Sequence, residues 1–114
     1  MKTKISNNIL ICYPEGRISN DSAEQFENQL TQFVDYHRNC DIILNLNDVP
    51  SISSKGIAVI ISVAQKMKSA DRILSICNPK DTVIKIISIL NISSLIAVYQ
   101  TEAEAFEELS KEVA

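Results

Sequence analysis

Apolar and polar residues alternate with two different periods along the chain, and the shorter period predicts an amino-terminal hairpin. Ile5 lies in a short run of alternating character, and residues 9–13 form a second, more apolar run. Asn7 and Asn8 separate the two runs, and such a pair is typical of a tight turn between antiparallel strands. A proline and a glycine in residues 14–16 end the second run.

Apolar residues three or four positions apart predict an amphipathic helix after residue 22. Residues 20–22, Asn-Asp-Ser, offer side chains that accept hydrogen bonds from the first amides of a helix. The apolar stripe comprises Ala23, Phe26, Leu30, Phe33, Val34 and His37. His37 is the only histidine of the chain and falls at the end of this stripe, so we assign it a structural role.

Three further helices are indicated by the same spacing. The first extends from about residue 55 to residue 69, with Ile57, Ile60, Val63, Ala64 and Met67 toward the sheet. The next is expected to begin at Asn78 as the cap and Pro79 as the first helical residue, with Asp81 near the positive end of the helix. Its apolar face comprises Val83, Ile84, Ile86, Ile87 and Leu90. A capping box at 101–104 opens the last helix, whose inner side comprises Ala103, Phe106, Leu109 and Val113.

The remaining apolar runs are short and rich in β-branched residues, which predicts strands. They occupy residues 41–46, 72–77 and 96–99. The order of elements is then ββαβαβαβα, which is typical of an α/β fold with crossover helices packed against a mixed, mostly parallel sheet. The hairpin adds an antiparallel amino-terminal edge strand. At 114 residues, we expect one domain, residues 1–114.

Charge and hydropathy exclude several classes of function. The net charge is −3, with basic residues scattered among acidic ones, whereas proteins that bind nucleic acid usually carry a basic patch. The amino terminus lacks the apolar segment of a signal peptide. The longest apolar run, residues 56–64, is shorter than the roughly 18 residues of a membrane helix. We therefore expect a cytoplasmic protein that neither binds nucleic acid nor inserts into a membrane.

The sequence lacks the motifs by which catalytic or cofactor sites are usually recognised. Gly16 and Gly56 are the only glycines, so neither a phosphate-binding loop nor a dinucleotide fingerprint can be formed. A G-x-S-x-G motif is absent as well. Cys12, Cys40 and Cys77 form no C-x-x-C pair, which argues against a zinc site or a disulfide framework. The sequence thus indicates no enzyme, no metal and no cofactor.

The segment before the second helix, residues 49–57, carries the strongest functional signal. It follows a strand and opens a helix, which places it at the carboxyl end of the sheet, where open α/β folds usually bind their ligands. Ser53 or Ser54 can cap the helix. Ala58 and Ser62 fall on the outer side of the helix, and these small side chains leave a shallow surface on which a partner could pack.

At residues 43–68, ILNLNDVPSISSKGIAVIISVAQKMK, the chain resembles STAS domains and, among them, the bacterial anti-sigma factor antagonists. Gly16-Arg17-Ile18 is similar to an early segment of that family, and residues 91–105 are similar to its closing strand and helix. The resemblance therefore covers almost the whole chain and implies a STAS fold.

The resemblance also implies a phosphorylation switch. In the family, Asp-Ser-Ser-Gly opens the second helix and the serine after the aspartate is phosphorylated. Here the aspartate position is Ser53, the acceptor position is Ser54, the second serine is replaced by Lys55, and the glycine is Gly56. Ser54 is thus the expected acceptor, and Ser53 is the second choice.

The family's partner is an anti-sigma factor that is also a serine kinase of the histidine-kinase-like ATPase type. The resemblance implies that the unphosphorylated chain binds this partner, that the phosphorylated chain is released, and that a serine phosphatase restores the first form. The alternative is a STAS subunit that is not phosphorylated and serves as a fixed interface in a transport ATPase or another regulatory complex. Under both readings the expected contact residues are Ser53, Ser54, Lys55, Gly56, Ala58 and Ser62.

Overall fold

A left-handed turn at two asparagines joins the first two strands of the sheet. Asn7 and Asn8 have φ angles of 52° and 62°, which a tight two-residue turn between antiparallel strands requires. The flanking strands are β1 (Lys2–Ser6) and β2 (Ile9–Tyr13), and they pair antiparallel with Ser6 opposite Ile9. The predicted hairpin is confirmed.

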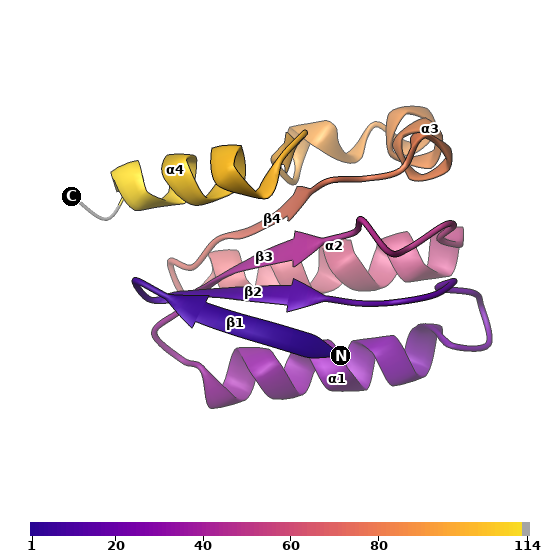
Figure 1. Ribbon diagram of the computed structural model, residues 1–114. Coiled ribbons are helices and arrows are strands. Elements are labelled where there is room, and N and C mark those ends of the chain that lie inside the picture. Colours follow the sequence, from indigo (N-terminus) through magenta and orange to yellow (C-terminus); the bar gives the residue numbers. More distant parts are fainter. Residues whose placement is uncertain (113–114) are drawn as a thin grey trace.

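The computed structural model describes residues 1–112. Within them the remaining strands are β3 (Asp41–Asn45), β4 (Leu74–Cys77) and β5 (Val98–Tyr99). The helices are α1 (Ala23–Tyr36), α2 (Ser54–Lys68), α3 (Asp81–Leu90), a 3-10 turn (Ile92–Ser94) and α4 (Glu102–Glu112). The strands lie in the order β1-β2-β3-β4-β5, and every neighbouring pair after β1–β2 is parallel (Figure 1). The predicted α/β order and the antiparallel edge strand are both confirmed.

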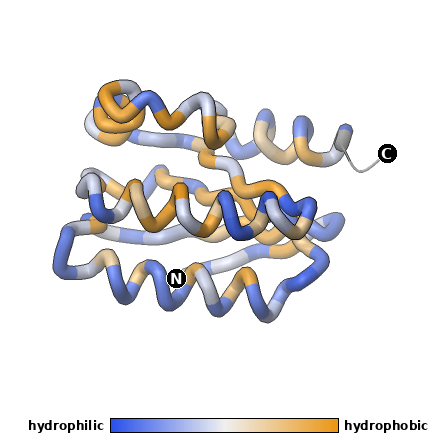
Figure 2. The backbone as a smooth tube through the Cα atoms, turned by 180° about the vertical axis from the view of Figure 1, so that it is seen from behind, coloured by the Kyte–Doolittle hydropathy of each residue, from blue (hydrophilic) through white to orange (hydrophobic). Residues whose placement is uncertain are grey.

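Helices cover both faces of the sheet, and the sheet separates two hydrophobic core clusters. α1 and α2 lie side by side on one face, as the view from behind shows (Figure 2), and α4 packs against β3, β4 and β5 on the other. The larger core cluster includes the predicted inward residues of α2, namely Ile57, Ile60, Val63 and Met67, all buried, with Ala64 half-buried at its edge. The smaller cluster joins Ile9, Ile11, Ile43 and Cys77 of the sheet to Ala105 and Leu109 of α4.

α3 begins later than its sequence predicts. Lys80 precedes its first residue, Asp81, whereas Asn78 has a φ of 54° and turns the chain out of β4. Asparagine tolerates this left-handed conformation, so Asn78 forms a turn and does not cap the helix. Ile84 and Leu90, expected on the inner face, remain 42% and 44% exposed. Among the described residues, the main contacts of α3 are with the 3-10 turn that follows it, so part of its apolar face stays exposed.

The amino terminus of α4 forms as predicted, but its inner face is different. The Thr101 hydroxyl accepts a hydrogen bond from the amide of Glu104 at 3.2 Å, as a capping residue does. Ala105 and Leu109 are buried and Phe106 is half-buried, whereas Ala103 is exposed. Two residues along a helix rotate by about 200°, so Ala103 cannot share the face of Ala105. Val113 lies outside the described residues.

Arg72 closes the carboxyl end of α1, a role that the sequence did not indicate. Its guanidinium donates to the carbonyl oxygens of Val34, His37 and Cys40 at 3.0, 2.7 and 2.9 Å. The last carbonyls of a helix lack partners within the helix, and Arg72 supplies them. The predicted strand 72–77 consequently starts only at Leu74. His37 takes part through its backbone, at the C-cap of α1.

We expect the three cysteines to resist alkylation in the native protein. All are buried and free, and burial raises the pKa of both Cys12 and Cys77 to about 12, far above the ordinary value of about 8.5. Because the thiolate is the reactive form, iodoacetamide at about pH 8 should label the unfolded chain at least tenfold faster than the native one. As the pH rises, the cysteine thiols of the unfolded chain lose their protons at a lower pH than the buried thiols of the native chain. The free energy of unfolding should therefore fall above about pH 8.5. Rapid native labelling of Cys12 or Cys77 would contradict the burial described here.

Candidate partner-docking site

The β3–α2 loop (residues 46–53) lies at the carboxyl ends of the parallel strands and is held by the segment that follows β2. Gly16 N donates to Asp48 O at 2.9 Å, and Ile18 N donates to Ser51 O at 3.0 Å. Ser53 N in turn donates to Ile18 O at 2.8 Å. These backbone bonds form a short parallel bridge between Ile18 and Ile52, so two segments far apart in the sequence act as one unit.

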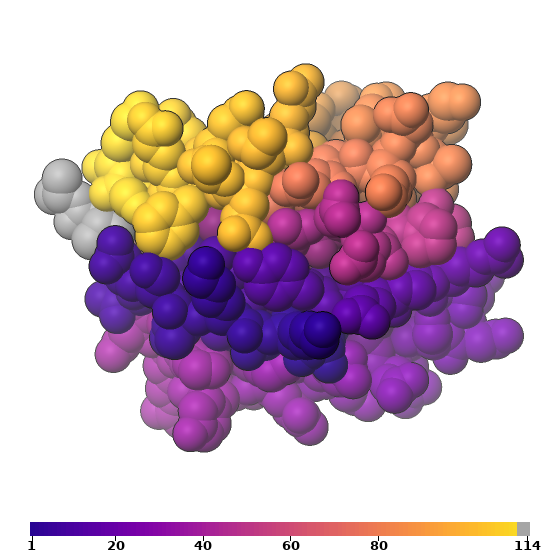
Figure 3. Space-filling model, viewed as in Figure 1, coloured from indigo at the N-terminus to yellow at the C-terminus, as the bar shows by residue number. Residues whose placement is uncertain are grey.

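α3 also contacts the β3–α2 loop, through one side-chain hydrogen bond. The Thr82 hydroxyl donates to the carbonyl oxygen of Pro50 at 2.6 Å. In the space-filling view the magenta segment that contains the loop reaches the surface between the violet amino-terminal part of the chain and the orange region of α3 (Figure 3). A partner that contacts the loop therefore approaches all three segments.

Ser53 caps α2 and leaves Ser54 at the surface. Ser53 has an extended backbone, and its hydroxyl oxygen accepts a hydrogen bond from Gly56 N at 3.0 Å. This is the geometry of an N-cap residue, so of the two serines that could cap the helix Ser53 does so. Ser54 is the first helical residue and is exposed. Its hydroxyl lies at the amino-terminal end of α2, where an anion is favoured by the helix dipole.

Gly56 lies beneath this surface and permits close packing. A Cβ atom at this position would lie 2.7 Å from Ile18 Cγ2 and 2.8 Å from Ile52 Cγ1. Because real Cβ atoms are not found so close to other carbons, α2 can approach the Ile18–Ile52 bridge only with glycine here. Gly56 is buried, so it shapes the site from below, whereas the sequence had placed it among the contact residues.

The other expected contact residues are accessible and lie on the first turns of α2 or at its cap. Lys55, Ala58 and Ser62 are exposed and Ser53 is half-buried. Ser54, Ala58 and Ser62 are spaced by four residues, which places them one above another on the same face of a helix. The outer face of α2 is therefore shallow and uncharged along this stripe, with Lys55 beside its amino-terminal end. We name this stripe, together with Ser53 and Lys55, the α2 surface.

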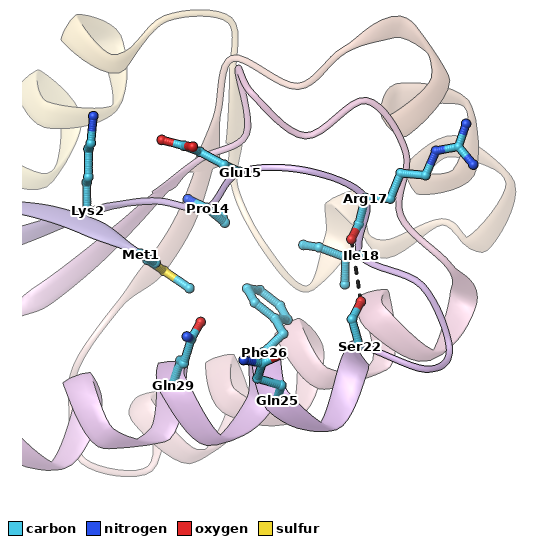
Figure 4. Close-up of a pocket in the computed structure, with 10 residues that line it drawn as sticks. All are labelled: Met1, Lys2, Pro14, Glu15, Arg17, Ile18, Ser22, Gln25, Phe26 and Gln29. Atoms are coloured by element: carbon cyan, nitrogen blue, oxygen red, sulfur yellow. Dashed lines mark hydrogen bonds between the residues drawn. The ribbon is translucent and has the colours of Figure 1, made fainter.

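A hollow next to the β3–α2 loop was not predicted from the sequence. It has a volume of about 550 Å³ and lies between the amino terminus, the segment after β2 and the start of α1 (Figure 4). Met1, Phe26 and Gln29 face its interior, whereas the Arg17 side chain is directed away from it. The Ser22 hydroxyl donates to the carbonyl oxygen of Arg17 at 3.4 Å and ties α1 to its rim. The positive φ of Gly16, 84°, permits the turn that forms this side of the hollow.

Residues 1–112 contain neither a cluster of metal-ligating side chains nor a membrane-spanning helix. The described chain contains no group of three or more His, Cys, Asp or Glu side chains placed to hold a metal ion. None of its helices is long and apolar enough to cross a membrane. At the carboxyl edge of the sheet, the structure presents an exposed serine, Ser54, at the capped start of α2.

The order of the elements and the topology of the sheet are those of a STAS domain, and the sequence agrees. Residues 1–105 match the STAS domain family, and the chain belongs to it. A protein of Thermotoga neapolitana named as an anti-sigma factor antagonist homologue is 28% identical over 107 residues, which span 93% of this chain and 94% of the relative.

Several solved structures have a similar fold. The crystal structure of a Thermotoga maritima protein named as an anti-sigma factor antagonist has a TM-score of 0.86 and 27% identity, covering 94% of this chain and 92% of that one. The unphosphorylated form of the anti-sigma factor antagonist SpoIIAA has a TM-score of 0.79 at 15% identity and covers 96% of each chain. The phosphorylated form of the Bacillus SpoIIAA has a TM-score of 0.69 at 14% identity, covering 95% of this chain and 97% of that one. At these low identities the SpoIIAA structures show the shared fold alone.

Proposed function

We propose that this chain is an anti-sigma factor antagonist that binds an anti-sigma factor through the α2 surface and is released when Ser54 is phosphorylated. The observation that carries the proposal is the position of Ser54: exposed, at the first residue of α2, and at the head of a stripe of small residues. The partner would be an anti-sigma factor with serine kinase activity, of the histidine-kinase-like ATPase type. A serine phosphatase would restore the binding form.

The local structure explains how the fold would tolerate a phosphate on Ser54. A phosphoserine carries about −1.5 to −2 charges at pH 7, and the amino-terminal end of a helix favours an anion. Lys55 follows immediately and is exposed, so its charge is available to a phosphate at this end of the helix. The cap itself is made by Ser53 and would persist in both forms, so that phosphorylation alters the surface and leaves the helix intact.

The charge of the phosphate would also lower the affinity of a partner for the α2 surface. An interface built around an uncharged hydroxyl must desolvate the phosphate, and burying an unpaired charge is costly. A loss of about 3 kcal/mol already lowers affinity by more than a hundredfold. SpoIIAA, whose fold this chain shares, occurs in an unphosphorylated and a phosphorylated form, and the proposed switch follows that analogy.

Ser53 stands where the resembled motif has an aspartate, and its geometry supports a simple reason for the exchange. Aspartate and serine are both strong N-cap residues, since each offers an oxygen to the amides of the first turn. Ser53 makes that bond to Gly56 N. We propose that Ser53 retains the capping role of the acid without its charge and that Ser54 is the acceptor.

Incubation with the cognate serine kinase and ATP should add one phosphate to the wild-type chain. Intact-mass analysis with peptide mapping should locate it on Ser54, because Ser54 is exposed whereas the hydroxyl oxygen of Ser53 is engaged with Gly56 N. Ser54→Ala should remain unmodified, and Ser110→Ala, at an exposed position on α4, should be modified at the wild-type rate. A phosphate on Ser53 in the wild type would contradict the assignment.

The absence of any phosphate, with a kinase shown to be active on another substrate, would favour the second reading. The chain would then be a fixed interface subunit of a transport ATPase or of another regulatory complex. The departures at Ser53 and Lys55 are the features that favour it. The α2 surface would remain the contact region, so Ala58→Arg should weaken partner binding under both readings.

A further inference from the structure

One buried amide joins α4 to the beginning of the β3–α2 loop. Asn45, the last residue of β3, is 9% exposed, and its Nδ2 donates to Oε1 of Glu102 at 3.1 Å. Its Oδ1 accepts a hydrogen bond from the backbone N–H of Asn47 at 2.9 Å. Asn45 thus bridges the first residue of α4 and the second residue of the loop.

The chemistry of the two partners fixes the orientation of this amide. An ionised carboxylate only accepts hydrogen bonds, and a backbone N–H only donates. If the Asn45 amide were reversed, its NH₂ group would face the Asn47 N–H and its oxygen would face Glu102. Only the observed orientation satisfies both contacts, so Glu102 holds Asn45 in the state that the loop needs.

Glu102 lies over the ends of three neighbouring strands, next to the start of the loop. Burial, together with a hydrogen bond to Glu102, raises the pKa of the Tyr13 phenol at the end of β2. The charge of Glu102 adds to burial in raising the pKa of Cys77 at the end of β4. The carbonyl oxygen of Cys77 accepts from Leu46 N, the first amide of the loop, at 3.0 Å. The first turn of α4 and the start of the loop are therefore anchored to the same strand ends.

Further hydrogen bonds link Asn47 to the rest of the loop, which leads to the α2 surface. The Asn47 side chain donates to the Asp48 carboxylate at 3.2 Å, and the Asp48 carbonyl oxygen accepts from Gly16 N at 2.9 Å. The loop then runs through the Ile18–Ile52 bridge to the Ser53 cap. We therefore expect a displacement of Asn47 to shift the hydrogen-bonded loop residues between it and the Ser53 cap.

We infer that Glu102 is a positioning residue for the β3–α2 loop: acting through Asn45, it couples the docking of α4 to the geometry in which Ser54 is presented. The consequence for Ser54 rests on the function proposed above, whereas the effect on the loop does not. α4 lies on the face of the sheet opposite α2, and each helix packs on its own core cluster (Figure 1), so this contact links the two faces of the domain.

Hydrogen exchange in the full-length chain tests the inference against a matched control. Glu102 and Glu104 both lie in the first turn of α4, so Glu102→Ala and Glu104→Ala remove similar helix-dipole contributions, but only Glu102 contacts Asn45. We expect amides 47–53 to exchange at least about threefold faster in Glu102→Ala, through easier local opening, and at the wild-type rate in Glu104→Ala. Glu102→Gln should restore slow exchange, because its amide oxygen can still accept from Asn45.

A second measurement is the rate at which the cognate serine kinase phosphorylates Ser54 in the same variants. We expect the rate to change at least about threefold in Glu102→Ala, and to stay at the wild-type value in Glu104→Ala and Glu102→Gln. Equal exchange in the two alanine variants overturns the inference whatever the kinase does. Faster exchange with an unchanged rate overturns the coupling to Ser54. A wild-type chain that no active kinase modifies counts against the proposed function, and the exchange measurement then decides the inference alone.

Discussion

Ser54→Asp should lower the affinity of the chain for the proposed anti-sigma factor partner by about a hundredfold or more, which corresponds to roughly 3 kcal/mol. The aspartate places a negative charge at the head of the α2 surface, where the first residue of the helix is exposed. The domain itself should remain folded, because the charge lies at the favourable end of the helix dipole. Isothermal titration calorimetry with the purified anti-sigma factor measures the change directly.

Two variants separate the effect of charge at Ser54 from charge in general. Ser54→Ala keeps the surface uncharged and should bind at nearly wild-type affinity, although it cannot be phosphorylated. Ser110→Asp adds the same charge on α4, at an exposed position on the opposite face of the sheet, and should bind as the wild type does. Wild-type affinity in Ser54→Asp, with an unfolding midpoint that shows an intact fold, would rule out the proposed switch.

Gly56→Ala should cost about 1–3 kcal/mol of folding free energy, the usual penalty for inserting a carbon into a packed core. The new Cβ would lie 2.7 Å from Ile18 Cγ2 and 2.8 Å from Ile52 Cγ1. Both neighbours are branched side chains fixed in the Ile18–Ile52 bridge, so they cannot rotate away as a long flexible chain would. Urea unfolding followed by circular dichroism measures the shift in midpoint.

The sign of this effect is what makes it informative. Replacing glycine by alanine inside a helix normally stabilises by up to about 1 kcal/mol, so a destabilisation reports the close contact alone. Ala58→Gly, on the exposed side of the same helix, provides the control and should cost about 1 kcal/mol through propensity. A Gly56→Ala variant that is more stable than the wild type would contradict the packing described here.

The residues that determine structure through their immediate neighbours were readable from the sequence. Asn7 and Asn8 specify their turn because asparagine tolerates the left-handed backbone. Thr101 caps α4, and the apolar spacing of α2 predicted both its buried and its exposed faces. These signals extend over at most a few turns of chain, so periodicity and capping chemistry were enough to identify the elements, their order and the surface that carries Ser54.

Only the tertiary structure decided the features that depend on distant residues. Asn78 turns the chain out of β4 and does not cap α3, and Gly56 is buried by Ile18 and Ile52. The choice between Ser53 and Ser54 as the cap, the attachment of residues 16–18 to the β3–α2 loop, and the bridge from Glu102 through Asn45 likewise depend on which segments meet in space. Local periodicity and capping signals indicate helices, strands and turns, whereas these contacts form only when the sheet brings the ends of its strands together.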